Sequence, residues 1–419
     1  MLDEDMVTMD VKQDRGPLSR VRVLDLTQFL SGPYASQILG DLGAEVIKVE
    51  SPDGDMTRRL PPHFVGTESA YYLSVNRNKR SLALDLKSEA GRVLARDLAL
   101  SCDIVIENFR PGILKRLGLS YEEIAAKKPA IVWCSISGFG QDGPYRDRPA
   151  YDMIVQAMSG GMSLTGEPDG PPVRSGIPLG DLAAGMYGVI GILAALADCR
   201  ATGRGRLVDV GMLDCQVAML SYQAAYHLAS GEIPDRQGRG HDSIPTYRAF
   251  TCGDGADIVI TANTERMWAN LCRVLGRSDL AEEERFRTNE RRYANRAALW
   301  EILDAAFAAK PAAAWVDDLL AAEVPAAVVN TLDRSLGDPQ VAHRNMVLRL
   351  AGPAGEQLRV AGNPIKFAGE AEVAHRYPPQ LGADNRAVLS SVLGLSDERI
   401  DLLERSGAFG GKPAEAKRA

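Results

Sequence analysis

The sequence predicts an α/β protein with a Rossmann-like parallel sheet in a large domain and a second, smaller α+β domain. A strand over residues 21–26, a helix over 31–42 that has Pro33 near its start, and a strand over 46–50 form a strand–helix–strand unit near the N-terminus. Two parallel strands need such a crossover, so this unit indicates a parallel sheet. The length of 419 residues exceeds what one hydrophobic core usually supports, so two domains are expected.

The later strands of the sheet are short apolar runs that end in polar or glycine-rich loops. We expect these strands at 82–86, 103–107, 131–136 and 207–210. Helices are expected over 90–100 and 213–230, and a long helix of small apolar residues is expected to begin at Asp181. Ligands of open parallel sheets gather at the carboxyl ends of the strands, where these loops fall.

A polar segment, 231–242, marks the expected start of the small domain. The domains predicted from this pattern are 1–230 as the first part of the large domain, 231–330 as the small domain, and 331–419 as a return to the large domain. Inside the small domain a Gly-Asp-Gly turn predicts a hairpin of 249–250 with 257–261. The other expected elements are helices at 265–275, 296–308, 312–322 and 398–406 and strands at 346–350 and 357–360; a frayed leader (1–17) and a disordered tail (410–419) complete the chain.

Composition argues against several classes of protein. The net charge is −7, and Lys and Arg alternate with Asp and Glu, so neither a nucleic-acid footprint nor a polybasic membrane segment is expected. We see no apolar run approaching the ~20 residues of a spanning helix. The six cysteines lie far apart without a CxxC pair, which predicts reduced thiols and a cytoplasmic location.

Common cofactor and metal motifs are absent from the sequence. It contains no GxGxxG, no GxxxxGK[ST], no GxSxG and no HExxH, and its five histidines are dispersed. We therefore expect no metal and no tightly bound cofactor.

Asp181 is the candidate that could carry chemistry. It follows a glycine at the start of the long apolar helix, where an Asp can cap the helix by accepting its first N–H groups. The positive end of the helix dipole would keep the carboxylate ionised. An ionised carboxylate beside a glycine-lined approach also suits covalent acyl transfer, and Gly160, Gly161 and Gly180 could offer N–H groups to an oxyanion or simply permit turns.

Several consecutive blocks of the sequence resemble the class III CoA transferases, the family that includes formyl-CoA:oxalate CoA transferase and the α-methylacyl-CoA racemases. The resemblance covers nearly the whole chain. Within the family, the sequence is most similar to the branch that acts on succinyl-CoA and dicarboxylates. The blocks are VLDLTQFLSGPYASQILGDLGAEVIKVE, GDMTR, YYLSVNRNKRSLALDLK, ENFRPGILKRLGL, GFGQDGPYRDRPAYD and PVRSGIPLGDLAAGMYGVIGILAAL with TGRG.

The resemblance implies that CoA moves from an acyl-CoA thioester to a free carboxylic acid through Asp181. The carboxylate would attack the thioester to give a mixed aspartyl anhydride, and the CoA thiolate would return to give an aspartyl-CoA thioester. An anhydride keeps the acyl group activated, whereas a serine ester would not. The acyl-CoA and the acid are the implied partners, in an interlocked homodimer.

The resemblance also implies binding residues for CoA and the substrate. The expected contacts are Gln28, Phe29, Leu30 and Ser31 in the first loop, Leu84 and Lys87 beside the adenine and phosphates, Asn108, Phe109 and Arg116 along the pantetheine and diphosphate, and Tyr151 and Asp152 near the reacting groups. The sequence departs from the formate enzyme at Ser51, where that enzyme has Arg. Arg58 could then hold the 3′-phosphate instead.

Tyr151 favours a transferase over the alternative, an α-methylacyl-CoA racemase or epimerase. The racemase branch carries His at this position, and a Tyr with its pKa of about 10 is a poor neutral-pH base. A catalytically silent acyl-CoA-binding protein is the second alternative. His241 with Ser243, or Arg174, could bind the acceptor's distal carboxylate, although for His241 we favour a place on a surface linker.

Overall fold

The computed structural model describes residues 16–410, and the chain forms two compact units. Within the described residues, the larger unit runs to Gly161, resumes over Ser175–Ala224 and again from His343; the smaller unit comprises Met162–Arg174 and Ala225–Ala342. The sequence predicts boundaries at 231 and 331 and places 162–174 in the large domain, whereas these residues belong to the smaller unit. The expected leader and tail fall almost wholly outside the described residues.

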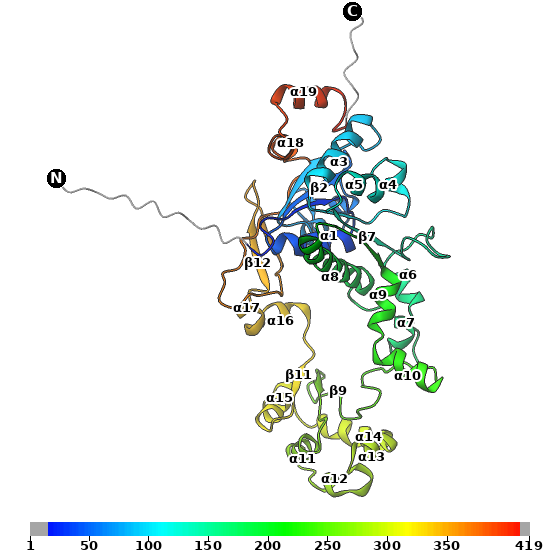
Figure 1. Ribbon diagram of the computed structural model, residues 1–419. Coiled ribbons are helices and arrows are strands. Elements are labelled where there is room, and N and C mark those ends of the chain that lie inside the picture. Colours follow the sequence, from blue (N-terminus) through cyan, green and yellow to red (C-terminus); the bar gives the residue numbers. More distant parts are fainter. Residues whose placement is uncertain (1–15, 411–419) are drawn as a thin grey trace, which may run out of the picture. The chain divides into compact units, whose positions relative to one another are not determined.

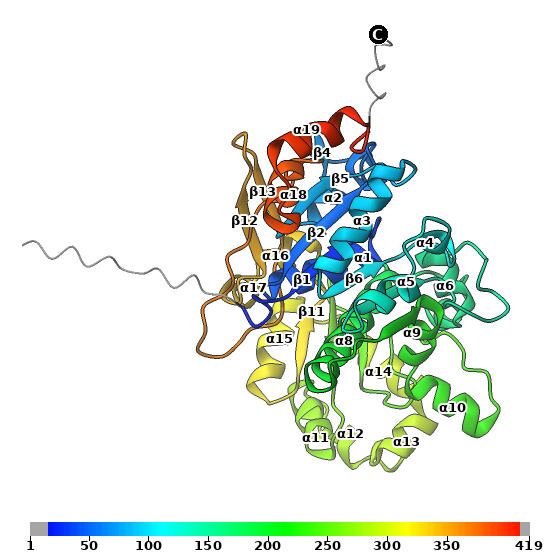
Figure 2. The same ribbon diagram turned by 45° about the horizontal axis from the view of Figure 1, so that its top comes forward.

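The larger unit (Figure 1) contains a six-stranded parallel sheet in the order β5-β2-β1-β6-β7-β8; Figure 2 labels the first four of these strands. Numbered along the chain this is the order 3-2-1-4-5-6, which is that of the Rossmann fold and confirms the predicted fold class. The strands are β1 (Arg22–Asp25), β2 (Glu45–Glu50), β5 (Lys79–Ala83), β6 (Ile104–Glu107), β7 (Val132–Ser137) and β8 (Leu207–Gly211).

Helices and short hairpins of the same unit surround this sheet (Figures 1 and 2). The helices are α1 (Ser31–Asp41), α2 (Ala70–Ser74), α3 (Glu89–Ser101), α4 (Ile113–Arg116), α5 (Tyr121–Lys127), α6 (Asp152–Met158), α8 (Leu179–Thr202), α9 (Met212–Met219), α18 (Asn385–Leu393) and α19 (Asp397–Arg405), with a 3₁₀ turn η1 (Met56–Arg59). The hairpins are β3 (Phe64–Val65) with β4 (Glu68–Ser69) and β12 (Val347–Ala351) with β13 (Gln357–Ala361).

Alternation along each strand divides the core between the two faces of the sheet. In β1, Val23 joins the cluster formed with α1, α8 and α9, whereas the next residue, Leu24, joins the cluster formed with α3, α5, α18 and α19. Val132 and Trp133 of β7 divide in the same way. Successive side chains of a strand point to opposite faces, so this sheet is buried on both sides.

Glycines in α8 allow the helix to pack closely against its neighbours. A Cβ on Gly185 would lie 2.7 Å from the carbonyl oxygen of Ser31 in α1, and one on Gly191 would lie 2.5 Å from Cγ1 of Val208 in β8. Figure 1 shows α1 and α8 side by side on the same face of the sheet. The small residues of α8 therefore bring the first turn of α1 against the first turns of α8.

Gly185→Ala is expected to lower the free energy of unfolding by roughly 1–3 kcal/mol, because the added methyl group overpacks the contact with Ser31. Elsewhere in a helix the same change would raise stability by about 1 kcal/mol. Urea unfolding would measure the difference, with Met186→Ala at the exposed neighbouring position as a control. A gain in stability for Gly185→Ala would contradict the close approach.

The smaller unit has a three-stranded antiparallel sheet in the order β11-β10-β9 around its own core, which includes Phe250, Trp268 and Phe307. The hairpin of β9 and β10 confirms the sequence prediction. The elements are β9 (Arg248–Thr251), β10 (Asp257–Ile260), α11 (Glu265–Val274), α12 (Asp279–Glu282), η2 (Glu284–Phe286), α13 (Asn289–Ala294), α14 (Arg296–Phe307), α15 (Ala312–Ala321), β11 (Ala326–Val328) and α16 (Leu332–Leu336). Three short helices cross a boundary between the units: α7 (Gly161–Leu164), α10 (Tyr222–Ser230) and α17 (Pro339–His343).

Two predicted elements differ from the structure. The single helix expected over 213–230 is interrupted between α9 and α10, where Ser221 adopts a left-handed φ of 49°. The strand expected at 82–86 is β5, which begins at Lys79, because Lys79 and Ser81 are buried and bonded to the carboxylates of Asp25 and Glu50. Buried polar partners of this kind cannot be recognised from a hydrophobic pattern.

Helix α8 also corrects the expectation that no apolar run approaches the length of a spanning helix. Its 24 residues satisfy the length and composition of a membrane span, but only half of its apolar stretch is buried inside the protein. Its buried residues, among them Ala184 and Ile192, belong to the core cluster on one face of the sheet. One face of α8 therefore packs in the core, while Met186 and Ile190 lie exposed.

Candidate active site

Asp181 is the third residue of α8 and is partly exposed. The expectation that it caps the helix is wrong, because Pro178 occupies the N-cap position. The first turn is instead bonded from outside: Oδ1 of Asp152 accepts the N–H of Gly180 at 2.8 Å. The carboxyl group of Asp181 therefore does not cap α8.

Asp152 links α6 to the start of α8. Its Oδ2 accepts a hydrogen bond from Nε2 of Gln156 at 2.7 Å, and Oε1 of Gln156 accepts the N–H of Ser175 at 3.0 Å. A Cβ on Gly180 would lie 2.6 Å from Cγ2 of Val155, so glycine is needed for this approach. Since the Gly180 N–H donates to Asp152, it does not serve an oxyanion in this arrangement, contrary to one of the sequence-based suggestions.

Burial, reinforced by the negative charge of Asp152, raises the pKa of Asp181 to about 7, although a hydrogen bond from the Ser31 hydroxyl acts in the opposite direction. The sequence predicts that the helix dipole keeps this carboxylate ionised. Burial and a second carboxylate outweigh that effect, so the group titrates near neutral pH.

Tyr71 of α2 is a member of this site that sequence reasoning did not select. Burial raises its pKa to about 12, and the negative charges of Asp181, Asp55 and Asp152 act in the same direction. Its hydroxyl is therefore a neutral hydrogen-bond donor in a region that contains several carboxylates. No motif singles out Tyr71 within its run of two tyrosines, and only the fold brings it to Asp181.

The loop from Gln28 to Ser31 reaches Asp181 through Ser31. The backbone of Gln28 is held by Asn108, whose Oδ1 accepts the Gln28 N–H at 2.9 Å and whose Nδ2 donates to the Gln28 carbonyl at 2.8 Å. The Phe29 ring meets the exposed ring of Tyr151 edge to face, with 5.9 Å between centroids. The structure thus brings together five of the predicted binding residues, Gln28, Phe29, Ser31, Asn108 and Tyr151, and Leu30 is the N-cap of α1.

A cavity of about 270 Å³ opens at the carboxyl ends of β1, β2, β5 and β6. Four predicted CoA contacts line it, Gln28, Leu84, Lys87 and Phe109, together with Ser51. Its walls are mainly apolar, and the exposed Lys87 supplies a cation. Because Gln28 lines the cavity and Ser31 bonds to Asp181, one loop connects the cavity to the candidate nucleophile.

Two predicted cations lie in different surroundings. Arg116 is exposed at the end of α4 and does not line the cavity. Arg58 is 5% exposed; its guanidinium bonds Glu50 through two nitrogens at 2.7 Å each and Glu68 at 2.8 Å, and it lies 3.8 Å over the Tyr72 ring. An ion pair between Arg58 and the 3′-phosphate of CoA stays a prediction. The phosphate would have to compete with the carboxylates of Glu50 and Glu68 for the guanidinium.

The alternative acceptor contacts lie in the smaller unit. His241 and Ser243 are bonded to each other, with the Ser243 N–H 3.2 Å from Nδ1 of His241, and Arg174 ends the segment 162–174 of that unit. Among residues 16–410, no group of three His, Cys, Asp or Glu side chains is placed to hold a metal ion.

Comparisons with known proteins agree with this architecture. The model of CoA-transferase family III matches residues 18–385. A mouse protein named succinyl-CoA:glutarate CoA-transferase is 41% identical over 94% of this chain and 90% of its own length. A Haloarcula hispanica protein named succinyl-CoA:mesaconate CoA-transferase is 39% identical over 94% of this chain and 97% of its own.

A crystal structure of a CAIB/BAIF family protein from Brucella suis has the same fold. The two structures superpose with a TM-score of 0.81 at 38% sequence identity, over 90% of this chain and all of that one. The match to the family model, residues 18–385, includes all six strands of the Rossmann-like sheet and Asp181. The chain therefore belongs to CoA-transferase family III and is a CoA-transferase.

Proposed function

We propose that this enzyme moves CoA from succinyl-CoA to a dicarboxylic acid and that Asp181 is the nucleophile. The observation that carries the assignment of Asp181 is its placement: a partly exposed carboxyl group, titrating near neutral pH, bonded to the loop that lines the cavity with the predicted CoA contacts. The names of two relatives that are 39% and 41% identical, a succinyl-CoA:mesaconate and a succinyl-CoA:glutarate CoA-transferase, support succinyl-CoA as the donor and a dicarboxylic acid as the acceptor.

In the first half-reaction, an Asp181 carboxylate oxygen attacks the thioester carbonyl carbon. The C–S bond breaks, CoA leaves as the thiolate, and the acyl group is held as a mixed anhydride. The thiolate then attacks the carbonyl carbon of the aspartyl side, which releases the donor as a free carboxylate and leaves CoA on Asp181 as a thioester.

The second half-reaction reverses this order with the acceptor. Its carboxylate attacks the aspartyl thioester, CoA leaves again, and the thiolate attacks the acceptor's acyl carbon in the new anhydride. The product is the acceptor's CoA thioester, and Asp181 returns as a carboxylate. The exchange needs no oxidant and no net proton, so one nucleophilic carboxyl group is enough for it.

Hydrogen bonding and charge around Asp181 suit these steps. The Ser31 hydroxyl donates to the carboxylate that must be ionised to attack. The Asp152 charge opposes ionisation and makes the carboxylate a stronger base than an ordinary Asp. The neutral Tyr71 hydroxyl can donate to carboxylate or carbonyl oxygens as charge develops there.

Removing the charge of Asp152 is expected to move the pH dependence of the reaction. For the wild-type enzyme, kcat/KM should fall as the pH falls through about 7, because only ionised Asp181 attacks. Asp152→Asn should move this acid limb to lower pH, since the pKa of Asp181 falls when the neighbouring negative charge is lost. Rate–pH profiles from pH 5 to 9 measure this shift, with Asp198→Asn as control, because the Asp198 carboxylate pairs with Arg206 near the C-terminal end of α8. An unmoved or raised limb would contradict the electrostatic role of Asp152.

The substrate proposal is tested with a panel of free acids incubated with succinyl-, acetyl- and oxalyl-CoA. Mass spectrometry should show new CoA thioesters of dicarboxylates such as glutarate or mesaconate. The same reactions in D₂O without an acceptor should leave the α-carbon undeuterated. Deuterium entering the α-carbon would instead indicate a racemase or epimerase, and binding of CoA without exchange would indicate a silent binding protein.

The assembly and location are part of the same proposal. We propose a homodimer in the cytoplasm that uses CoA thioesters as substrates, without a tightly bound cofactor, nucleic acid or membrane. Exposed apolar side chains on helices of the larger unit support a protein interface: Met153 and Ile154 on α6 and Ile190 on α8 are 52%, 48% and 61% exposed.

A further inference from the structure

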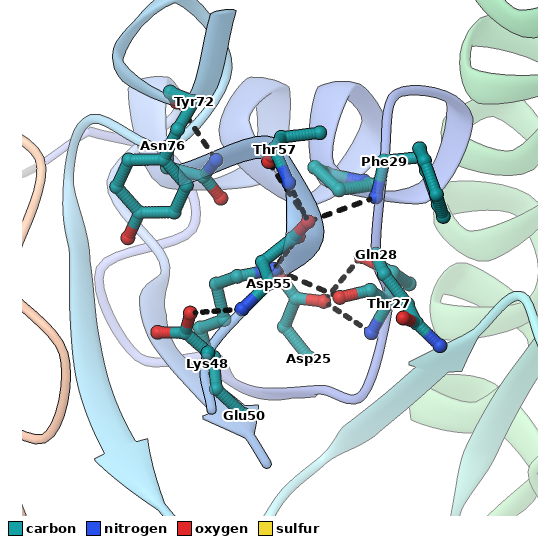
Figure 3. A network of polar contacts seen from close by, with 12 residues as sticks. Asp25, Thr27, Gln28, Phe29, Lys48, Glu50, Asp55, Thr57, Tyr72 and Asn76 are labelled. Carbon is teal, nitrogen blue, oxygen red and sulfur yellow. Dashed lines mark hydrogen bonds and ion pairs between the residues drawn. The ribbon is translucent and has the colours of Figure 1, made fainter. Parts of the chain in front are cut away.

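Side chains of β1 and β2, shown in Figure 3, and a residue that follows β6 hold the backbone of the loop that joins β1 to α1. Oδ1 of Asp25 accepts the Thr27 N–H at 2.8 Å, and Nζ of Lys48 donates to the Thr27 carbonyl at 2.8 Å. Asn108, at the end of β6, binds both polar groups of the Gln28 backbone. Consecutive main-chain groups of the loop are therefore fixed by side chains instead of by regular secondary structure.

Phe29 is the strained residue of this loop. Its φ is 63°, in the left-handed region that is unfavourable for a residue with a Cβ. The Phe29 N–H points to Oδ1 of Asp55, at 3.4 Å, as Figure 3 shows. Such a conformation persists only where its surroundings determine it, and it often occurs at functional sites.

Asp55 is a buried carboxylate to which the predicted mechanism gives no role. It is 4% exposed and belongs to the GDMTR block. Its Oδ1 also accepts the N–H and hydroxyl of Thr57 at 3.0 and 2.8 Å, and its Oδ2 pairs with Nζ of Lys48 at 3.1 Å. Lys48 is fully buried, so the two charges depend on each other.

The segment that carries Asp55 is itself fixed in place. Gly54 has a left-handed φ of 78°, and a Cβ there would lie 2.9 Å from Cδ of Arg58. The N–H of Asp55 donates to Oε2 of Glu50, the partner of Arg58. Asp55 is therefore a rigid acceptor, whereas Phe29 belongs to the part of the loop that must reach Asp181 through Ser31.

We propose that Asp55, held by Lys48, is a positioning residue that keeps Phe29 in its left-handed conformation, so that the loop presents the Ser31 hydroxyl to Asp181. The inference rests on the proposed CoA transfer through Asp181. Ser31 begins α1 two residues after Phe29, so a change of φ at Phe29 redirects the chain that enters the helix. The same change moves the Phe29 ring away from Tyr151.

Asp55→Asn removes the charge with almost no change in shape. The kcat of CoA exchange should fall by about tenfold or more, while the matched variant Asp384→Asn should keep it. Asp384 is a suitable control because its carboxylate also accepts a main-chain N–H, that of Ser81, in the same unit but outside the loop.

Glycine at position 29 separates positioning from general damage to the fold. Phe29→Gly and Phe29→Ala both lose the ring, but only glycine adopts a positive φ without strain. With Asp55 present the two variants should have similar kcat. In the Asp55→Asn background the glycine variant should be about fivefold or more faster than the alanine variant, which is the scale of the left-handed penalty. An equal ratio in both backgrounds would overturn the inference.

A second pair of variants covers the case in which Asp55→Asn does not fold because Lys48 is left buried without its partner. Lys48→Met with Asp55→Asn removes both charges, and replacing a whole buried ion pair is often tolerated. The ratio of kcat for Phe29→Gly to kcat for Phe29→Ala is then measured in that double variant. A higher ratio than with Asp55 present supports the inference, and an equal ratio overturns it.

Hydrogen exchange of a peptide covering 27–31 gives a readout that does not depend on activity. Exchange should be faster in the Asp55 variant than in the wild-type enzyme, and unchanged exchange would overturn the inference. If the wild-type chain exchanges CoA but the Asp55 variant is unaffected, only the inference fails. If the wild-type chain exchanges no CoA, the proposed function fails, and the hydrogen exchange alone decides whether Asp55 holds the loop.

Discussion

Asp181→Ala is expected to lower the rate of CoA exchange by roughly 10⁴-fold or more, the scale of losing a covalent nucleophile. The alanine side chain has no oxygen that can attack the thioester, so neither the anhydride nor the aspartyl thioester can form. Exchange of labelled succinate into succinyl-CoA measures this directly, because it needs only the first half-reaction. Hydroxylamine or borohydride added during turnover should modify Asp181 in the wild-type enzyme.

Stability measurements distinguish the loss of CoA exchange in Asp181→Ala from unfolding of the variant. A carboxyl group whose pKa is raised from 3.8 to about 7 by folding binds protons more tightly in the folded state, so its contribution to stability decreases as the pH rises through that range. Asp181→Ala should therefore raise the urea midpoint relative to wild type more at pH 8 than at pH 4. Asp198→Ala in the same helix should keep full exchange. Substantial exchange by a folded Asp181→Ala enzyme would exclude the covalent mechanism.

Arg58→Ala is expected to lower the free energy of unfolding by about 3–5 kcal/mol. The change leaves Glu50, which is 4% exposed, without its two hydrogen bonds from the guanidinium, and it removes the stacking on Tyr72. Urea unfolding at neutral pH measures the loss. Arg58→Lys keeps the charge but not the bidentate geometry and should lose less, which provides a folded variant for assays.

A thioester of 3′-dephospho-CoA tests whether Arg58 also binds the 3′-phosphate. The quantity compared is kcat/KM for the normal thioester divided by kcat/KM for the dephosphorylated one. If Arg58 bonds only Glu50 and Glu68, Arg58→Lys should leave this ratio unchanged. Lys87→Ala, at the exposed rim of the cavity, should lower that ratio if Lys87 binds this phosphate. A lower ratio for Arg58→Lys would show that the sequence-based prediction was right and that the buried arrangement opens.

The sequence was informative wherever a local pattern had a single structural solution. Apolar strands that alternate with helices led to the parallel sheet, because a crossover is the way that two successive strands become parallel. The Asn108 and Phe109 loop follows β6 at the carboxyl edge of the sheet, as expected from the end of an apolar run. The charged start of β5 at Lys79 was missed, since its burial depends on the Asp25 carboxylate of another strand.

At the site, the residue types were predictable but their electrostatics were not. Asp181 could be selected from its place at the start of an apolar helix, yet the helix-cap role expected for it was wrong, and burial raises its pKa to about 7. Asp152 is 29 residues earlier in the chain, and its charge acts on Asp181 because Gly180 lets α6 approach. Tyr71 was missed for the same reason.

The sequence by itself determined the Rossmann-like class, the family resemblance and Asp181 as the candidate nucleophile, because these depend on residue order and local periodicity. Only the tertiary structure decided that Arg58 is buried between carboxylates, that Asp181 titrates near pH 7, and that Asp55 faces the strained Phe29. Burial and charge at a residue are set by neighbours distant in the chain, and a linear pattern does not contain them.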